Sequence, residues 1–332
     1  MLFRSQDEPK RYRGWAQCGH TKHVRMRSCR RCVKFRPCIL PPLIGEDVRV
    51  TAVRLPPRRS LREHALRFVD SKRRSAAPIS PEMEDRIEWP RLIPFALMHL
   101  GCLGVFVTGA STTAVVTCVV LYALRMFSIT AFYHRYLSHR SFQAPRWLVF
   151  LGAMGATAAA QRGPLWWAAH HRKHHRYADQ EGDAHSPHGE GGFWWSHIGW
   201  FTTRRNFRTD EAQVRDLAAF PELRWLDRFD ILVPIGLLVA LGVAGALLAE
   251  YAPSLGTSAS QMMVWGFCIS TTAVFHATSA VNSLSHLIGR RTFPTRDHSR
   301  NSLWIALLTF GEGWHNNHHW CPGSVQIGRA HV

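Results

Sequence analysis

The chain has 332 residues, with 41 lysines and arginines, 23 acidic residues, 20 histidines and a formal net charge of +18. A positive charge of this size is typical of nucleic-acid-binding proteins, but residues 1–82 hold 20 basic and 7 acidic residues, a net of +13, and residues 83–332 carry only +5. No nucleic-acid partner is therefore expected. The eight cysteines do not form a disulfide framework, because four lie in this basic segment and three others lie in or beside apolar segments.

The N-terminal segment, residues 1–82, has no sustained apolar period and is rich in Arg, Pro and Cys. It is predicted to be a basic tail of low order, or to be translated from too early a start codon, with Met83 as the alternative start. A zinc module is a second hypothesis for this segment, although no second well-spaced cysteine pair follows. Its ligands would be Cys18, His20, His23, Cys29 and Cys32.

Four apolar segments follow, each near the ~20 residues that a helix needs to cross a bilayer. They cover residues 92–110, 111–130, 231–249 and 261–281. Short connections join them in pairs, so two helical hairpins are expected. A shorter apolar run at 147–160 has fourteen residues and is expected to lie at the interface or pack on the site.

Basic residues gather between 135 and 228 and again between 290 and 300. Several of them lie near the ends of the apolar segments, where positive charge marks the cytoplasmic side. The sequence therefore predicts an integral, multi-pass protein of a bacterial inner membrane, with its polar segments and both termini in the cytoplasm.

Histidines gather in four motifs: HRYLSH at 134–139, HRKHH at 171–175, NSLSH at 282–286 and HNNHH at 315–319. The HxxHH spacing places three imidazoles on one face of a helix, and the first and last residues of NSLSH share a face in the same way. Nine imidazoles and one amide are too many for one ion and suit two, with room for water or oxygen. The candidate ligands are His134, His139, His171, His174, His175, Asn282, His286, His315, His318 and His319.

Imidazole suits zinc, copper, iron and nickel. A single structural zinc would leave most of these histidines unexplained, and the HExxH and Glu-x-x-His patterns are missing from the sequence. We therefore expect an all-α membrane protein with a nitrogen-rich dinuclear site at the cytoplasmic ends of its helices. The other histidines are expected to be solvated, packed or flanking: His99, His170, His185, His188, His197, His276 and His298.

The motifs HRYLSHRSF, HRKHHRY, NSLSHLIG and GEGWHNNHH resemble those of the membrane-bound fatty acid desaturases, in particular the acyl-CoA delta-9 group, over residues 84–325. The resemblance implies four transmembrane helices under a cytoplasmic helical cap, in which the nine histidines hold two iron ions and Asn282 holds a water. It also implies an acyl tunnel lined by Gln161 and Trp167, O₂ as co-substrate, and a ferredoxin, rubredoxin or cytochrome b5-type electron donor with its reductase.

The expected reaction is introduction of a cis double bond into a long-chain fatty acyl-CoA, and the sequence leaves an acyl-lipid substrate open. The closed end of the tunnel, which would set the chain length, is expected within 111–130. Hydroxylation of an alkane or lipid, and metal handling without catalysis, remain alternatives.

Residues 83–325 are expected to form the desaturase domain, incomplete at its C-terminus relative to the family. Residues 326–332 end in IGRAHV, which matches a translated sequencing adapter, and are expected to be an artefact.

Overall fold

The computed structural model describes residues 60–76, 81–326 and 328, which belong to one compact unit spanning residues 57–332. The hypothetical zinc ligands at 18–32 lie outside the described residues. Within the described part of the chain the secondary structure is helical, apart from three isolated β-bridges. The predicted all-α class is thus confirmed.

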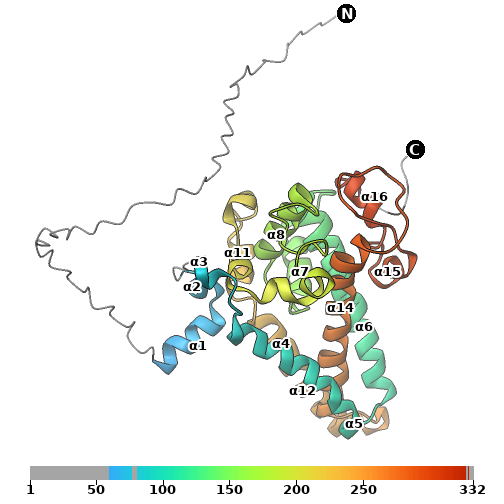
Figure 1. The fold of residues 1–332 in the computed structure, drawn as a ribbon. Coiled ribbons are helices and arrows are strands. Elements are labelled where there is room, and N and C mark those ends of the chain that lie inside the picture. The colour runs from blue at the N-terminus through green and yellow to red at the C-terminus, as the bar shows by residue number, and fades with distance from the viewer. Residues whose placement is uncertain (1–59, 77–80, 327, 329–332) are drawn as a thin grey trace, which may run out of the picture. The chain divides into compact units, whose positions relative to one another are not determined.

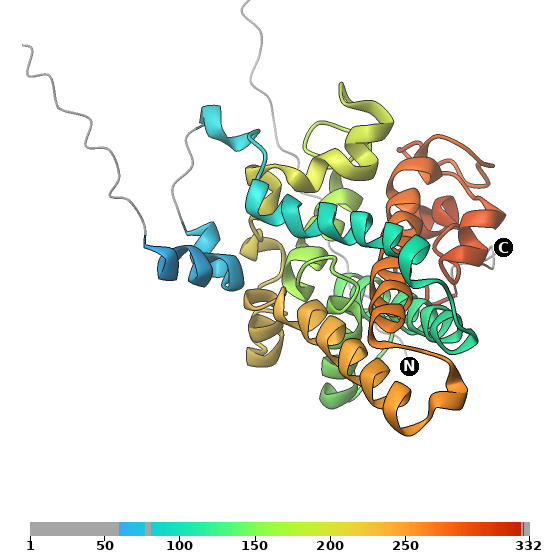
Figure 2. The same cartoon turned by 90° about the horizontal axis from the view of Figure 1, so that it is seen from below.

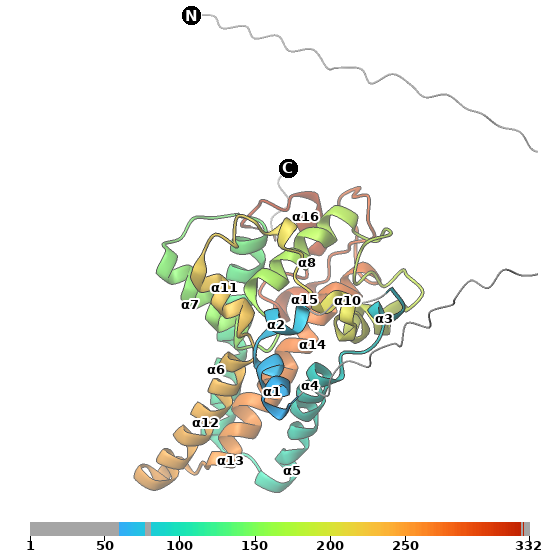
Figure 3. The same ribbon diagram turned by 90° about the vertical axis from the view of Figure 1, so that its left-hand side faces the viewer.

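Four stretches are long and apolar enough to cross a membrane, and they form the stem in the lower half of Figures 1 and 3. The first contains α4 (Trp89–Gly101), η1 (Cys102–Gly104) and α5 (Val105–Thr108), and the second contains α6 (Thr112–Ser128) and the π-helical η2 (Ile129–Ser138). The third is α12 (Leu232–Tyr251). The fourth contains α13 (Ala259–Gln261), the π-helical η7 (Met262–Ile269), α14 (Ser270–Ser283) and η8 (Leu284–His286).

The two predicted hairpins are confirmed, and their connections meet at the lower end of the stem. The Trp265 indole N–H and the Gln261 side-chain amide donate to the carbonyls of Gly109 and Thr108, at 3.0 and 2.9 Å. The Thr113 hydroxyl donates to the Leu255 carbonyl of the other connection at 3.0 Å. Figure 2 shows α14 between α6 on one side and α4 and α12 on the other.

The outer surface of the stem is apolar. Leu97, Phe106, Val107 and Val239 are among its side chains with more than half of their surface exposed. In water a surface of this kind would be unfavourable, whereas lipid solvates it. The stem is therefore compatible with an integral membrane protein.

The remaining helices form a cap on the upper end of the stem (Figures 1 and 3). The apolar run at 147–160 forms α7 (Arg146–Thr157), which is not among the candidate spans in the described residues and packs against α6 and η2. The other elements of the cap are α8 (Pro164–Tyr177), α9 (Gly192–Trp194), η3 (Trp195–Gly199), η4 (Trp200–Thr202), α10 (Arg204–Phe207), η5 (Glu211–Gln213), α11 (Pro221–Arg228), α15 (Leu303–Leu308) and α16 (His315–Trp320); η6 (Pro253–Leu255) lies in the second hairpin connection.

The N-terminal segment differs from the sequence prediction. Instead of low order up to residue 82, the structure has α1 (Leu61–Val69), α2 (Ser71–Ser75) and α3 (Pro81–Glu84). Ser60 caps α1, and Asp70 caps α2 while it pairs with Arg228 at 2.6 Å. These helices depend on caps and ion pairs more than on an apolar face, which is why hydrophobic periodicity did not reveal them.

Two glycines of α12 provide a test of helix packing in the stem. A Cβ at Gly245 would lie 2.6 Å from the Ser258 carbonyl oxygen and 2.7 Å from the Ala259 Cα, whereas one at Gly236 would meet no described atom within 4 Å. We expect Gly245→Ala to destabilise the protein by about 1–3 kcal/mol because backbone must move, and Gly236→Ala to be neutral or mildly stabilising. Thermal unfolding in detergent measures both, and equal shifts for the two variants would contradict the packing described here.

Candidate metal centre

Five histidines form the first group of possible metal ligands: His134, His139, His171, His175 and His318, each with a ring nitrogen within 4.8 Å of the others. Their Nε2 atoms face one another. The Nε2 separations are 2.8 Å for His139–His171 and for His175–His318, 2.9 Å for His134–His318 and 3.0 Å for His171–His175. Three elements that are distant in sequence, η2, α8 and α16, supply these side chains.

A π-helical turn brings the two histidines of HRYLSH into this group. His139 lies five positions after His134. This spacing places the two side chains on different faces of an α-helix, but it matches the i→i+5 hydrogen-bond period of a π-helix. In η2 the backbone N–H of His139 donates to the His134 carbonyl at 3.3 Å, and the two imidazole centroids lie 4.9 Å apart.

Four histidines form the second group: His174, His286, His315 and His319. The Nε2 atoms of His286 and His315 are 3.0 Å apart, and those of His174 and His319 are 3.3 Å apart. Each HxxHH helix serves both groups, because α8 supplies His174 here and α16 supplies His315 and His319. The structure thus brings all nine predicted histidines together in two adjacent sets.

The donor chemistry of both groups fits a bound transition metal. A neutral imidazole carries only one N–H, so Nε2 atoms that converge in fours and fives cannot all be paired by hydrogen bonds. Burial and the neighbouring imidazoles lower the pKa of His139 to about 2 and hold the pKa of His171, His175 and His315 well below the ordinary value. Unprotonated nitrogens about 3 Å apart are what a metal with imidazole bonds of roughly 2.0–2.1 Å requires.

Carboxylates that sequence reasoning missed hold the opposite nitrogens of four of these rings. Asp183 faces His174 Nδ1 at 3.0 Å, Asp179 faces His286 Nδ1 at 2.7 Å, and Asp297 faces His319 Nδ1 at 2.8 Å. Glu312 contacts His134 Nδ1. A carboxylate on Nδ1 fixes the proton there and leaves Nε2 free to bind metal. Asp179 and Glu312 lie within four residues of a histidine motif, whereas Asp183 and Asp297 lie eight and eleven residues from the nearest one, so the sequence alone does not mark these acids as partners of particular rings.

Burial alone would raise the pKa of Asp183, but the facing imidazoles of His174 and His185 outweigh it and hold this pKa well below the ordinary value. For His174, burial lowers the pKa and the charge of Asp183 outweighs that effect, so the pKa is raised. In the pair of His174 and Asp183, the proton on Nδ1 of the ring therefore stays in the hydrogen bond to the carboxylate.

Asn282 belongs to neither histidine group. It lines a small cavity of about 30 Å³ whose wall also includes His134 and His171 of the first group and His174 and His315 of the second. A space of this size holds about one water molecule. The position is compatible with the water-holding role that the resemblance implies.

Most of the other histidines lie outside the two groups. His170 packs on Trp166, with centroids 4.6 Å apart. His99, His276 and His197 form a hydrogen-bonded chain between α4, α14 and η3, with nitrogen separations of 3.1 and 3.0 Å. His185 lies close to the second group, because its ring is 4.4 Å from that of His174 and both face Asp183.

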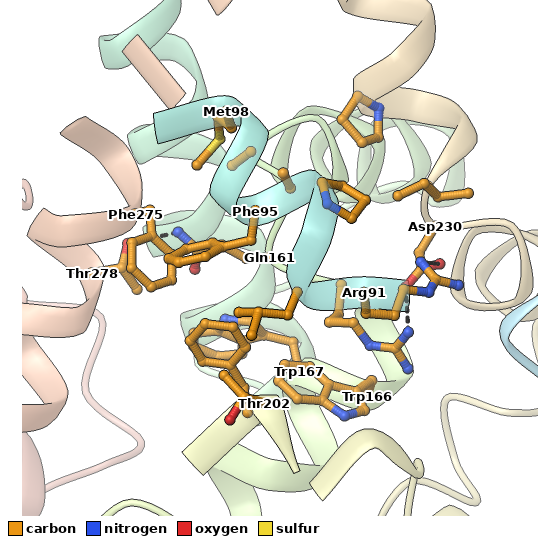
Figure 4. A pocket seen from close by; sticks show the side chains of 18 of the residues that line it. Arg91, Phe95, Met98, Gln161, Trp166, Trp167, Thr202, Asp230, Phe275 and Thr278 are labelled. Carbon is orange, nitrogen blue, oxygen red and sulfur yellow. Dashed lines mark hydrogen bonds and ion pairs between the residues drawn. The ribbon is translucent and has the colours of Figure 1, made fainter. Parts of the chain in front are cut away.

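A larger cavity of about 370 Å³ reaches the first group (Figure 4). Both residues predicted to line the tunnel line it: Trp167 stacks on His171 with centroids 5.0 Å apart, and the Gln161 amide donates to the Thr278 hydroxyl at 3.1 Å. The apolar part of this cavity is formed by side chains of α4, α12 and η7, which include Phe95, Met98, Leu238 and Phe267, whereas Met126, Ile129 and Thr130 line the smaller cavity beside Asn282. The expected position of the closed end within 111–130 stays a prediction.

Comparison with known proteins identifies the family. The family model described as "Fatty acid desaturase" matches residues 110–325. The chain belongs to the fatty acid desaturase family. The desaturase chain is 36% identical over 244 residues to the sn-1 stearoyl-lipid 9-desaturase of Anabaena variabilis, which covers 73% of this chain and 84% of that protein.

Two further relatives are the sn-2 palmitoyl-lipid 9-desaturase of Nostoc sp. (strain 36) and the chloroplastic palmitoyl-monogalactosyldiacylglycerol delta-7 desaturase of Arabidopsis thaliana. The first is 38% identical over 201 residues, 59% of this chain and 65% of that protein. The second is 39% identical over 197 residues, 58% of this chain and 49% of that protein. The predicted desaturase family is confirmed, whereas these relatives are named for lipid-bound acyl chains and not for the expected acyl-CoA.

The carboxylates that face the desaturase histidines can be tested through metal content. We expect Asp183→Asn and Asp297→Asn to lower metal affinity about 10- to 100-fold, because each leaves a ligand imidazole without its partner. Metal per protein after dialysis against a chelator, measured by plasma mass spectrometry, gives the result. Glu222→Gln removes a half-buried carboxylate that pairs with Arg146 on another face of the cap and is the control. Metal retention equal to that control would show that the carboxylates do not support the ligands.

Asp227 of α11 positions the helix that carries HRKHH. Its carboxylate accepts from the Trp166 backbone N–H in the first turn of α8 at 2.8 Å, and a Cβ at Gly163 would lie 2.3 Å from the Asp227 Cα. Burial raises the pKa of Asp227 to about 6, despite this hydrogen bond.

This pKa predicts a pH dependence of stability in the desaturase. Between pH ~4 and ~6 the folded chain keeps a proton on Asp227 that the unfolded chain loses, so stability falls as pH rises through that window and the loss is complete above it. We expect Asp227→Asn to stabilise the protein above pH 6, by roughly 1–2 kcal/mol, and to have little effect near pH 4. Unfolding temperatures of wild-type protein and the variant from pH 4 to 8 measure this effect, and Asp210→Asn at an exposed position is the charge-matched control. A difference in unfolding temperature between wild type and Asp227→Asn that does not change with pH would refute the raised pKa of Asp227.

Proposed function

We propose that the chain is an O₂-dependent desaturase that introduces a cis double bond at carbon 9 of an acyl chain carried by a membrane lipid. The single observation that carries this proposal is the cavity between α4 and α12 that ends against His171 and Trp167. Its apolar length suits a hydrocarbon chain, and the two histidine groups lie behind its wall. The histidine motifs and the family support the reaction type.

The cavity favours a lipid substrate over a soluble thioester. Leu97 of α4 and Ile235 of α12 both line it, yet they are 60% and 42% exposed on the stem surface. Side chains of the lipid-facing surface therefore continue into the cavity wall, and an acyl chain can enter from the bilayer without leaving it. The names of the relatives agree with this direction of entry. Acyl-CoA is the alternative substrate that the experiment below separates.

Two contacts orient the acyl chain in this proposal. The Gln161–Thr278 hydrogen bond ties the segment before α8 to α14, and both side chains line the cavity together with His171. The Trp167 ring, stacked on His171, forms a flat wall that excludes water from the reacting carbons. A chain bent at this point presents two adjacent methylenes to the metal centre in the arrangement that gives a cis double bond.

We propose two iron ions as the metals, one held by each histidine group, with Asn282 holding a water on one of them. Iron in this all-nitrogen setting would supply the oxidant that unactivated C–H bonds require. The overall reaction takes one acyl chain, one O₂, two electrons and two protons to one alkene and two waters. The electrons would come from a separate ferredoxin, rubredoxin or cytochrome b5-type protein with its reductase.

The proposal also covers sidedness and domain organisation. The cap, with the metal centre, would face the cytoplasm of a bacterial cell, because the basic residues of the long loop lie there. The desaturase domain proposed over residues 83–325 would extend back to residue 60, because Asp70 and Ser71 contact Arg228 and Asp230 beside α12.

Lipid profiling in a host that lacks delta-9 desaturase activity tests the function. We expect cells that express the chain with an electron donor to accumulate cis-9 monounsaturated acyl chains in their membrane lipids, as read by gas chromatography and mass spectrometry. His318→Ala, which removes a proposed ligand, should abolish the product.

Other outcomes would contradict the proposal. A hydroxylated chain without a new double bond would indicate the hydroxylase alternative, and a product formed only from added stearoyl-CoA in isolated membranes would replace the lipid substrate. Donor-independent metal uptake without O₂ consumption would indicate a metal-handling protein.

A further inference from the structure

The polar end of the large cavity is formed by two arginines that share one carboxylate. Arg91 lies 3.3 Å from Asp230 Oδ1, and Arg162 lies 2.9 Å from Asp230 Oδ2. The three side chains are 12%, 14% and 2% exposed, and all three line the cavity. Figure 4 shows Arg91 and Asp230 at the opposite side of the pocket from Phe275 and Thr278.

The hydroxyl of Ser71, at the junction of α1 and α2, is inserted into this cluster. It accepts from Arg91 Nη2 at 2.7 Å and from Arg162 Nη1 at 3.1 Å, and it donates to Asp230 Oδ1 at 2.7 Å. One neutral oxygen thus receives hydrogen bonds from two guanidinium groups. Two guanidinium groups converging on one oxygen is the arrangement by which arginines bind phosphate.

Positive charge exceeds negative charge around this end of the cavity. Glu88, which also lines the cavity, is shared by Arg74 and by Arg204, the latter at 3.2 Å. Four guanidinium groups therefore surround two carboxylates, an excess of two positive charges. Asp227 lies near Arg162 and, because burial raises its pKa to about 6, removes at most one of them.

The two arginines also have hydrogen-bonding capacity left over. The Nε–H groups of Arg91 and Arg162 are buried and have no hydrogen-bond partner in the described part of the chain. Buried donors without acceptors are costly, and an anion with several oxygens would satisfy them. Phe207, over whose ring the Arg162 guanidinium lies at 3.9 Å from the centroid, keeps that group in place.

We propose that Arg91 and Arg162 form a binding site for the phosphate group of the acyl substrate, and that Ser71 occupies the place of a phosphate oxygen when no substrate is bound. The α1–α2 junction is then a lid over the headgroup end of the cavity. This inference rests on the proposed function, which supplies the acyl chain in the apolar part of the same cavity. Phosphate is present in a phospholipid and in coenzyme A alike, so the test has to distinguish these two sources.

Binding to the purified full-length protein tests the site without requiring turnover. The probes are dipalmitoyl-phosphatidylglycerol, monogalactosyldiacylglycerol with the same acyl chains, and stearoyl-CoA, each titrated in detergent and followed by native mass spectrometry. We expect wild-type protein to bind phosphatidylglycerol more tightly than the galactolipid, and Arg162→Gln and Arg91→Gln to reduce that ratio of affinities about tenfold. Arg162→Lys should recover part of the ratio.

Two further variants separate binding from folding. Arg146→Gln breaks the ion pair between the exposed Arg146 of α7 and Glu222 of α11 and should leave the ratio unchanged. Ser71→Ala keeps both arginines and removes their internal acceptor, so it should tighten phosphatidylglycerol binding by about two- to fivefold; a purely structural serine would have no such effect. This variant keeps the proposal testable if Arg91→Gln does not fold.

Equal affinity of wild-type protein for the two lipids, or parallel losses for both in the arginine variants, would overturn the phosphate site. If the arginine variants weaken the binding of stearoyl-CoA but not that of phosphatidylglycerol, the site stands and coenzyme A supplies the phosphate. The proposed lipid substrate would then be wrong. If phosphatidylglycerol binding depends on the arginines but cells that express the protein make no new double bond, the proposed function is wrong and the phosphate site stands.

Discussion

Nine imidazoles have to converge in a buried space at one end of four long apolar helices, and much of the architecture serves that requirement. Burial and mutual repulsion disfavour the imidazolium form, as the lowered pKa of His171 and His175 shows. Carboxylates beside the outer nitrogens orient several of these rings, because they hold the proton at Nδ1 and leave Nε2 facing the other histidines. The site is thereby shaped for metal by the same low-polarity surroundings that exclude water.

That requirement explains why the helices near the site depart from ideal geometry. The second span changes from α- to π-helix at Ile129, and only in this register do His134 and His139 point to one place. The two HxxHH motifs need no such change, since ordinary α8 and α16 already align their three rings. Arg125, buried in α6, fixes the start of this region by donating to the Thr271 hydroxyl at 2.5 Å and to the Leu121 carbonyl at 3.0 Å.

Sequence reasoning succeeded where a feature repeats at a regular period and failed where it depends on register or on distant partners. Four apolar segments of membrane length and two HxxHH motifs were sufficient to predict the stem, the two hairpins and the set of histidines. The π-helical turn at Ile129 has no periodic signature. The carboxylates Asp179 and Asp297 are separated by more than a hundred residues, and they are recognisable only after folding places both beside the second group of histidines. The helices before residue 75 escaped prediction because ion pairs with Arg228 and Asp230, not an apolar stripe, hold them.

The distribution of ligands along the chain has a consequence for biosynthesis. Residues His315, His318 and His319 lie on α16, the last helix of the described chain, and they belong to both histidine groups. Neither group can reach its full set of nitrogens until the chain has been synthesised through residue 319, after all four candidate spans. A chain that has not yet been synthesised to that point holds only incomplete sets of these imidazoles.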